Sequence, residues 1–231
     1  MLKAIFFDLD YTLYDQQQYL QGAFRDVAES LARECHLDGK YLYRSLIAIW
    51  KQQGTDYGYL FNDWLNLFGL STQARIKCCI DVFHAHQPQN LTLYPGVDKV
   101  LSDLKDCYLI GLITDGDLQM QENKARALKL SEQFEVILNA RQLLLRKPDP
   151  RIIEYALQET KMSPTQAAYV GDHPVKDIVC ARHAGVCAVR VLSGEFRALP
   201  DNEISPPNHR IDDMRSLQRL LCEIDTCNAN V

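Results

Sequence analysis

Short apolar runs alternate with stretches of helical periodicity over most of the chain. Residues 3–7 carry such a run, which ends abruptly at Asp8. A short apolar segment bounded in this way is typical of a parallel strand that is covered on both faces. Similar runs follow at residues 108–114, 136–138, 167–171 and 187–192, with a weaker one at residues 209–211. These segments predict the strands of one parallel sheet.

The segments between these runs have the period of a helix. The spacing i, i+3, i+4, i+7 is followed by Val97, Val100, Leu101 and Leu104, and again by Leu217, Leu220, Leu221 and Ile224. Strands that alternate with helices favour an open parallel sheet with right-handed crossovers. We therefore predict an α/β fold whose Rossmann-like sheet is flanked by helices.

Residues 15–90 break this alternation. Apolar positions at helical spacing mark two amphipathic helices, one with Leu20, Ala23, Phe24, Val27 and Leu31 and one with Leu42, Leu46, Ile49 and Trp50. Further helices are expected near residues 59–68 and 72–86, so the segment has enough apolar faces for a small bundle. We predict an all-helical insert at residues 15–90 in an α/β core made of residues 1–14 and 91–231.

Composition and charge narrow the classes of function and partner. The chain of 231 residues has 25 basic and 30 acidic side chains and a net charge of −5, which disfavours a generally basic surface for a nucleic acid polymer or an anionic membrane. No apolar run approaches the roughly 20 residues of a membrane span, and the N-terminus lacks the features of a signal peptide. The eight cysteines show no disulfide framework, so we interpret them as reduced, buried thiols of a cytoplasmic protein: Cys35, Cys78, Cys79, Cys107, Cys180, Cys187, Cys222 and Cys227.

Acidic residues collect where the predicted strands end. The first strand is followed by Asp8 and Asp10, the second ends in Thr114 before Asp115 and Gly116, and the fourth ends in Gly171 before Asp172, with Asp177 and Lys147 nearby in the pattern. Ligands of open α/β sheets bind at the carboxyl ends of the strands. Carboxylates packed together repel one another unless a cation joins them, and hard oxygen ligands around a partly hydrated site favour Mg²⁺.

Taken in this order, the motifs resemble the haloacid dehalogenase-like superfamily of phosphohydrolases. The first motif of that family, DxDx[TV], reads Asp8-Leu9-Asp10-Tyr11-Thr12; the second, a Ser or Thr after an apolar strand, is Thr114; the third, a Lys before a helix, is Lys147; and the fourth, GDxxxxD, runs from Gly171 to Asp177. The helical insert between the first and second motifs is similar to the C1 type of cap.

The resemblance implies a role for each of these residues. Asp8 would be the nucleophile that forms an aspartyl-phosphate, and Asp10 would protonate the leaving group and then deprotonate the attacking water. Mg²⁺ would be held by Asp8, the Asp10 carbonyl and Asp172, with Asp177 as a ligand directly, through water or as an orienting residue. Phosphate would be bound by Lys147, by the Thr114 hydroxyl and by backbone N–H groups near Asp115 and Gly116.

Three features of the sequence leave questions open. The family usually has Asn after the Thr of the second motif, and Asp115 in its place is tolerable only where that position contributes mainly its backbone N–H. His173 beside Asp172 is interpreted as a loop-packing residue rather than a metal ligand. Substrate specificity is expected from the cap and its crossing, where the candidates are Tyr11, Tyr14, Gln17, Arg25, Arg44, Lys51 and Tyr57.

We therefore predict a Mg²⁺-dependent phosphatase that acts on a small phosphorylated metabolite such as a sugar phosphate or a nucleotide. A phosphomutase or other phosphotransferase on the same scaffold is an alternative. A 2-haloacid dehalogenase is disfavoured because only a leaving alkoxide requires Asp10. A catalytically silent binding protein is disfavoured because all four motifs are present. The oligomeric state, monomer or dimer, is not indicated by the sequence.

Overall fold

A six-stranded parallel sheet forms the centre of the protein. The computed structural model describes residues 1–229, with side chains described as far as residue 226. The strands lie in the order β3-β2-β1-β4-β5-β6. They are β1 (Ala4–Phe7), β2 (Leu109–Thr114), β3 (Val136–Asn139), β4 (Ala167–Gly171), β5 (Cys187–Val191) and β6 (His209–Ile211). The predicted α/β fold is thereby confirmed, since each predicted apolar run became a strand of this sheet.

The helices connect these strands in sequence order. Four lie between β1 and β2, namely α1 (Gln17–Cys35), α2 (Gly39–Gln53), α3 (Leu60–Asn66) and α4 (Gln73–Ala85), followed there by α5 (Val97–Lys105). The others are α6 (Leu118–Ala127), α7 (Arg151–Thr160), α8 (Cys180–His183) and α9 (Leu217–Ala229). Short 3₁₀ turns are η1 (Ala140–Leu143), η2 (Pro164–Gln166), η4 (Glu195–Ala198) and η5 (Met214–Ser216), and η3 (Pro174–Val179) is a π-helical turn.

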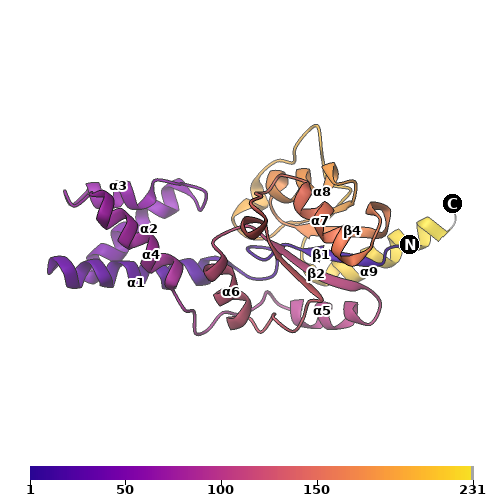
Figure 1. The fold of residues 1–231 in the computed structure, drawn as a ribbon, viewed down its shortest axis with the longest axis horizontal. Coiled ribbons are helices and arrows are strands. Elements are labelled where there is room, and N and C mark those ends of the chain that lie inside the picture. The colour runs from indigo at the N-terminus through magenta and orange to yellow at the C-terminus, as the bar shows by residue number, and fades with distance from the viewer. Residues whose placement is uncertain (230–231) are drawn as a thin grey trace.

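Both faces of the sheet are covered, which explains the unbroken apolar runs. Ile5 and Phe7 of β1 belong to one buried cluster with residues of α5, α6 and α9, whereas Ala4 and Phe6 belong to a second cluster with α7 and α8. In Figure 1, α7 and α8 accordingly lie above β1 and β2, and α5 lies below them. Because successive strand side chains point to opposite faces, every position of β1 is buried and none can be polar without cost.

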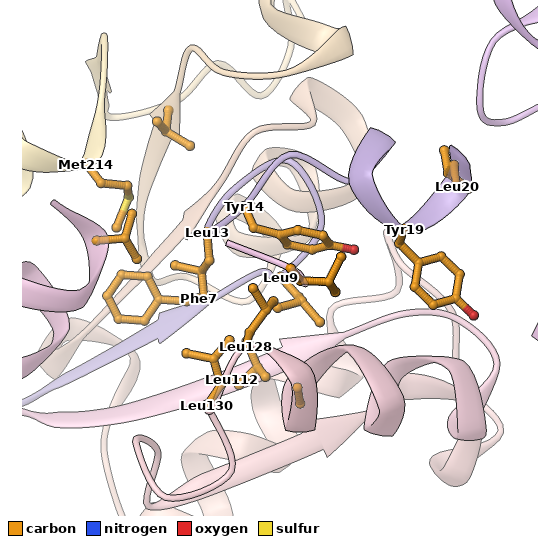
Figure 2. Packing of buried hydrophobic residues seen from close by; sticks show 14 of the residues in the cluster. Phe7, Leu9, Leu13, Tyr14, Tyr19, Leu20, Leu112, Leu128, Leu130 and Met214 are labelled. Carbon is orange, nitrogen blue, oxygen red and sulfur yellow. The ribbon is translucent and has the colours of Figure 1, made fainter. Parts of the chain in front are cut away.

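The helices α1–α4 form a group of their own beside the sheet (Figure 1), and α1 contacts both α2 and α4. The apolar cluster continues into this group from Phe7 through Leu13 and Tyr14 to Tyr19 at the start of α1, as Figure 2 shows. Apolar packing therefore joins the helical group to the α/β part. That residues 15–90 act as a separate cap domain stays a prediction.

The cysteines were expected to be buried and reduced, and no segment was expected to span a membrane. Cys79 and Cys180 are buried, but Cys78, Cys107 and Cys222 are exposed, so the prediction that the cysteines are buried is wrong for these three because they lie on solvated helix faces or at a helix end. None of the seven cysteines with described side chains is in a disulfide; Cys227 lies outside the described side chains. Over residues 1–229, none of the helices combines the length and apolar character needed to cross a bilayer.

Packing between β1 and β2 yields a first prediction. A Cβ atom on Gly111 would lie 2.7 Å from Cδ1 of Phe6, far inside van der Waals contact. We expect Gly111→Ala to lower the free energy of unfolding by about 1–3 kcal/mol through overpacking. Gly58→Ala is the matched control, since a Cβ there meets nothing within 4 Å, and its effect should stay within about 0.5 kcal/mol. Urea denaturation would contradict this packing argument if both variants lost the same stability.

Candidate active site

A cavity of about 190 Å³ opens at the carboxyl ends of β1, β2 and β4. Six of its lining residues are acidic: Asp8, Asp10, Asp56, Asp115, Asp172 and Asp177. Four are basic: Arg141, Arg146, Lys147 and Lys176. The others are Tyr11, Gln16, Thr55, Gly116, His173 and Phe196. The edge of the sheet predicted from the sequence is therefore the place where Asp8, Asp10, Lys147, Asp172 and Asp177 meet.

Lys147 stands between two buried carboxylates at the floor of this cavity. Its Nζ donates to Oδ1 of Asp8 at 2.6 Å and to Oδ1 of Asp177 at 2.9 Å. The ammonium group also lies 5.2 Å from the centre of the Tyr169 ring. Charge-assisted hydrogen bonds of this length offset the cost of burying the three groups. The lysine of the third motif thus reaches across the sheet to the aspartates of the first and fourth.

A third buried carboxylate, that of Asp172, completes the cluster. Oxygen atoms of Asp8, Asp172 and Asp177 all lie within 4.8 Å of one another. Thr12 donates a hydrogen bond of 3.3 Å to Oδ1 of Asp172, whereas Oδ2 of Asp172 is buried without any partner among the described residues. A buried carboxylate oxygen without a donor is costly, and a cation held between these three groups would remove that cost.

Steric constraints explain why the fourth motif has a glycine at position 171. A Cβ atom on Gly171 would lie only 2.5 Å from Cβ and 2.6 Å from Cγ of Asp177. Because Gly171 has no side chain, Asp177 can fold back so that its Oδ2 accepts the backbone N–H of His173 at 3.0 Å. Its other oxygen accepts from Lys147 and, at 3.3 Å, from Tyr169. Both oxygens of Asp177 are therefore occupied by protein donors.

Asp10 lies beyond the end of β1, where the chain turns sharply. Tyr11 has a φ of 58°, in the left-handed region that a tyrosine rarely adopts. The Asp10 carboxylate accepts from Lys124 and Gln121 of α6 and from Tyr14 in the loop before α1. Lys124 and Gln121 belong to no recognisable motif, and neither was predicted from the sequence.

Thr114 of the second motif and the two residues that follow it line different hollows of the protein. Asp115 and Gly116 line the cavity, but Thr114 is buried and lines a separate hollow beside α6 with Gln121 and Asn139. The structure therefore does not bring Thr114 to the cavity with the other predicted phosphate-binding residues. The Asp115 carboxylate accepts the backbone N–H of Lys147 at 3.2 Å. Its side chain thus supports the loop that carries Lys147.

Burial and charge determine the protonation behaviour of this cluster. Burial raises the pKa of Asp8 to about 7; Lys147 opposes the shift, whereas Asp177 and Asp10 add to it. Burial, followed by the nearby Asp177 and Asp8 charges, also raises the pKa of Asp172 well above its ordinary value. Burial alone would lower the pKa of Lys147, but Asp177 and Asp8 outweigh it and raise the pKa. Lys147 therefore stays charged, whereas the carboxyl groups of Asp8 and Asp172 keep their protons to a higher pH than ordinary carboxyl groups do.

His173 and Arg190 hold the surroundings of Asp172. Nδ1 of His173 accepts the backbone N–H groups of Val175 and Lys176, each at 3.1 Å, so the imidazole caps the turn η3. This placement agrees with the interpretation of His173 as a loop-packing residue. The Arg190 side chain is buried and donates to the carbonyl oxygens of Asp172 at 3.2 Å and of Phe196 at 2.8 Å. One guanidinium thus anchors both the end of β4 and the turn η4.

Residues outside the motifs also line the cavity, and they contact residues within the motifs. The loop after α2 contributes Thr55, whose backbone N–H donates to Oε1 of Glu195 at 3.1 Å and whose hydroxyl donates to Oε2. Tyr11 donates to Oε2 of the same carboxylate at 3.1 Å, and Lys176 pairs with Asp56. Of the predicted specificity candidates, Tyr11 lines the cavity, whereas Tyr14, Gln17, Arg25, Arg44, Lys51 and Tyr57 do not. Thr55 and Asp56, which also line the cavity, lie in a loop between two predicted helices, where no hydrophobic periodicity pointed to a site.

Comparison with known proteins adds the family. Residues 5–191 match the model of the family described as haloacid dehalogenase-like hydrolase. The chain belongs to this family. The prediction made from the four motifs is confirmed, and with it the prediction of an enzyme of the hydrolase class.

Individual relatives agree with this assignment. The chain is 30% identical over 220 residues to the glyceraldehyde 3-phosphate phosphatase of Methanocaldococcus jannaschii, and the alignment covers 94% of this chain and 96% of that protein. It is 34% identical over 126 residues to the phosphoserine phosphatase of Thermus thermophilus, covering 54% of this chain and 49% of that protein. The structure of the HAD-hydrolase YfnB from Bacillus subtilis bound to magnesium is similar in fold, with a TM-score of 0.73, 18% identity and coverage of 95% and 98%.

The raised pKa of Asp8 predicts how pH changes cation binding and stability. Below pH 7 the folded chain keeps a proton on Asp8 that the unfolded chain releases near pH 4, so the stability from this group falls as pH rises from about 4 to 7. A divalent cation must displace that proton at pH 5.5 but not at pH 8. We expect Mg²⁺ at about 30 times its Kd to raise Tm by about 4–8 °C at pH 8 and by less at pH 5.5.

Two variants test whether this cluster is responsible. Asp172→Asn should abolish the Mg²⁺-dependent rise in Tm because it removes a buried carboxylate. Asp81→Asn, at an exposed ion pair with Lys77, is the matched control and should keep the rise. A rise of equal size at both pH values, or one that survives in Asp172→Asn, would show that Mg²⁺ binds elsewhere.

Proposed function

We propose that the protein is a Mg²⁺-dependent phosphatase that hydrolyses a small phosphomonoester through an aspartyl-phosphate on Asp8. The observation that carries the proposal is the buried cluster of Asp8, Asp172 and Asp177 around Lys147 at the carboxyl edge of the sheet. A nucleophilic carboxylate, a permanent cation and a cation-binding group of oxygens are thereby within reach of one small ligand. The names of the two phosphatase relatives support the same reaction.

The donors present fit Mg²⁺. Asp8, the Asp10 carbonyl and Asp172 would hold the ion, which the unpartnered Oδ2 of Asp172 favours. Asp177 has both oxygens occupied by Lys147, Tyr169 and the His173 N–H, so it would act through water or by orienting its neighbours. When bound, such an ion neutralises charge on phosphoryl oxygens.

The protein groups divide the remaining work. The Asp8 carboxylate attacks phosphorus, and the bond from phosphorus to the leaving oxygen breaks while Asp10 gives that oxygen a proton. Asp10 then takes a proton from the water that attacks the phosphorus of the aspartyl-phosphate, which releases inorganic phosphate and restores Asp8. Lys147 and the backbone N–H groups near Asp115 and Gly116 bind the phosphoryl oxygens. Asp115 keeps Lys147 in position through its backbone N–H.

Size and surroundings point to a small substrate. The cavity of about 190 Å³ is smaller than the sites of roughly 300–1,000 Å³ that hold drug-sized ligands. A triose phosphate such as glyceraldehyde 3-phosphate is therefore the first metabolite to test. We further propose that α1–α4 form the cap and that Thr55 and Asp56 face the substrate's leaving group. The absence of disulfides among the described cysteines is consistent with a cytoplasmic enzyme.

A phosphate-release screen over a metabolite library, with and without Mg²⁺, tests the reaction class and finds the substrate. Wild-type protein should release phosphate from at least one phosphomonoester only when Mg²⁺ is present. Formation of an isomeric phosphate without free phosphate would point instead to a mutase, and halide release from a 2-haloacid would point to a dehalogenase. No metal-dependent release from any member of the library would refute the proposal.

Two substitutions test the assigned roles. Asp8→Asn should lower kcat by at least about 10³-fold in protein that still folds, because the nucleophile is lost. Asp10→Asn should lower kcat by about 10²–10⁴-fold, the range of general acid–base catalysis. Steady-state rates on the best substrate measure both effects. Full turnover by Asp10→Asn would rule out the acid–base role of this residue.

A further inference from the structure

A second buried lysine, Lys124 of α6, serves no role in the mechanism above. Its side chain is fully buried, and Nζ lies 2.8 Å from Oδ1 and 2.9 Å from Oδ2 of Asp10. The ammonium group also lies 4.8 Å from the centre of the Tyr19 ring. A lysine is almost never fully buried unless it is paired. Since α6 packs in the α/β part, Lys124 ties Asp10 to an element of the core.

Two neutral donors complete the surroundings of the Asp10 carboxylate. Tyr14 donates to Oδ1 at 2.7 Å, and Gln121 donates to Oδ2 at 3.1 Å. A carboxylate offers about four acceptor positions, and these contacts occupy two on each oxygen. Gly116 makes room for the Gln121 contact, since a Cβ there would lie 2.4 Å from Nε2 of Gln121. Figure 2 shows the Tyr14 ring reaching from the apolar cluster toward the start of α1.

We propose that Lys124 is a positioning residue for Asp10, which it holds in the orientation needed for proton transfer to the leaving group. The inference rests on the proposed function, because it concerns the group assigned as general acid and base. Among the described contacts of Asp10, that of Lys124 comes from a charged donor and reaches both oxygens, so it restrains the carboxylate plane most strongly. Tyr14 and Gln121 are neutral donors that each hold one oxygen.

Proton transfer requires one of the four contacts to open. Gln121 is neutral and makes the longest of them, and its Oε1 is already buried without a partner among the described residues. As the Gln121 contact opens, Oδ2 of Asp10 takes up a proton from solvent in the cavity and gives it to the leaving oxygen, which occupies the place of Gln121, while Lys124 keeps its contact with Oδ1. Correct placement of the acid matters most for a leaving group that is a poor one without protonation, such as an alkoxide.

The test compares two substrates in one preparation. kcat/KM is measured for 4-nitrophenyl phosphate, whose leaving group needs little protonation, and for the alkyl phosphate that the screen finds to be hydrolysed best. We expect Lys124→Met to lower the alkyl value at least about 100-fold and the aryl value less than about 10-fold. The ratio of the two values does not depend on how much of the preparation is folded, so reduced stability cannot imitate the result. Asp10→Asn gives the reference pattern for a lost acid.

Matched variants complete the design. Lys99 contacts both carboxylate oxygens of Asp103 at 3.0 and 2.8 Å in the same manner but is exposed, so Lys99→Met should leave both rates unchanged. Lys124→Arg keeps the charge without the compact head and should give an intermediate ratio, which also decides the question if Lys124→Met does not fold. An alkyl-to-aryl ratio within threefold of the wild type in the folded Lys124 variants would overturn the proposal. A wild type without phosphatase activity would instead refute the proposed function.

Discussion

Lys147 makes it possible for this protein to bury several aspartates side by side. Asp8 and Asp177 share its ammonium group at 2.6 and 2.9 Å, and Asp172 lies against them with one oxygen unpartnered. Without the lysine, the mutual repulsion of these groups would favour their protonation or separation. The loop that delivers Lys147, the close approach of Asp177 to Gly171 and the Arg190 anchor below Asp172 all serve to keep these charges in one place.

The sheet provides the geometry that this arrangement needs. Since β1, β2 and β4 are adjacent and parallel, their carboxyl ends lie at the same edge, and residues 8, 115 and 172 meet although they are far apart in the chain. Apolar packing on both faces holds the strands in register, and the residues at that edge are not needed for this packing. The edge is thus free to carry charges that no core position would tolerate.

Much of this could be predicted from the sequence because it depends on local pattern. The strands could be predicted from the apolar runs, and the edge that carries the candidate site could be predicted from the acidic residues at the strand ends. Thr114 is a residue whose place in the motif could be recognised from the sequence but whose side-chain direction could not. That direction depends on packing against α6. Lys124 and Gln121 could not be found, since a lysine and a glutamine in an amphipathic helix normally lie on a solvated face. Thr55 and Glu195 meet across 140 positions, and no periodicity encodes such a contact.

The contact between Thr55 and Glu195 also bears on how the cavity communicates with solvent. It joins the helical group to the turn η4 through polar, solvent-exposed hydrogen bonds rather than through apolar packing. Hydrogen bonds to a charged carboxylate contribute on the order of 1.5–3 kcal/mol each, and at an exposed position water can take the place of the donor. Solvent therefore reaches the contacts on the Thr55 side of the cavity, whereas the ion pairs of Lys147 with Asp8 and Asp177 on its other side are shielded from it.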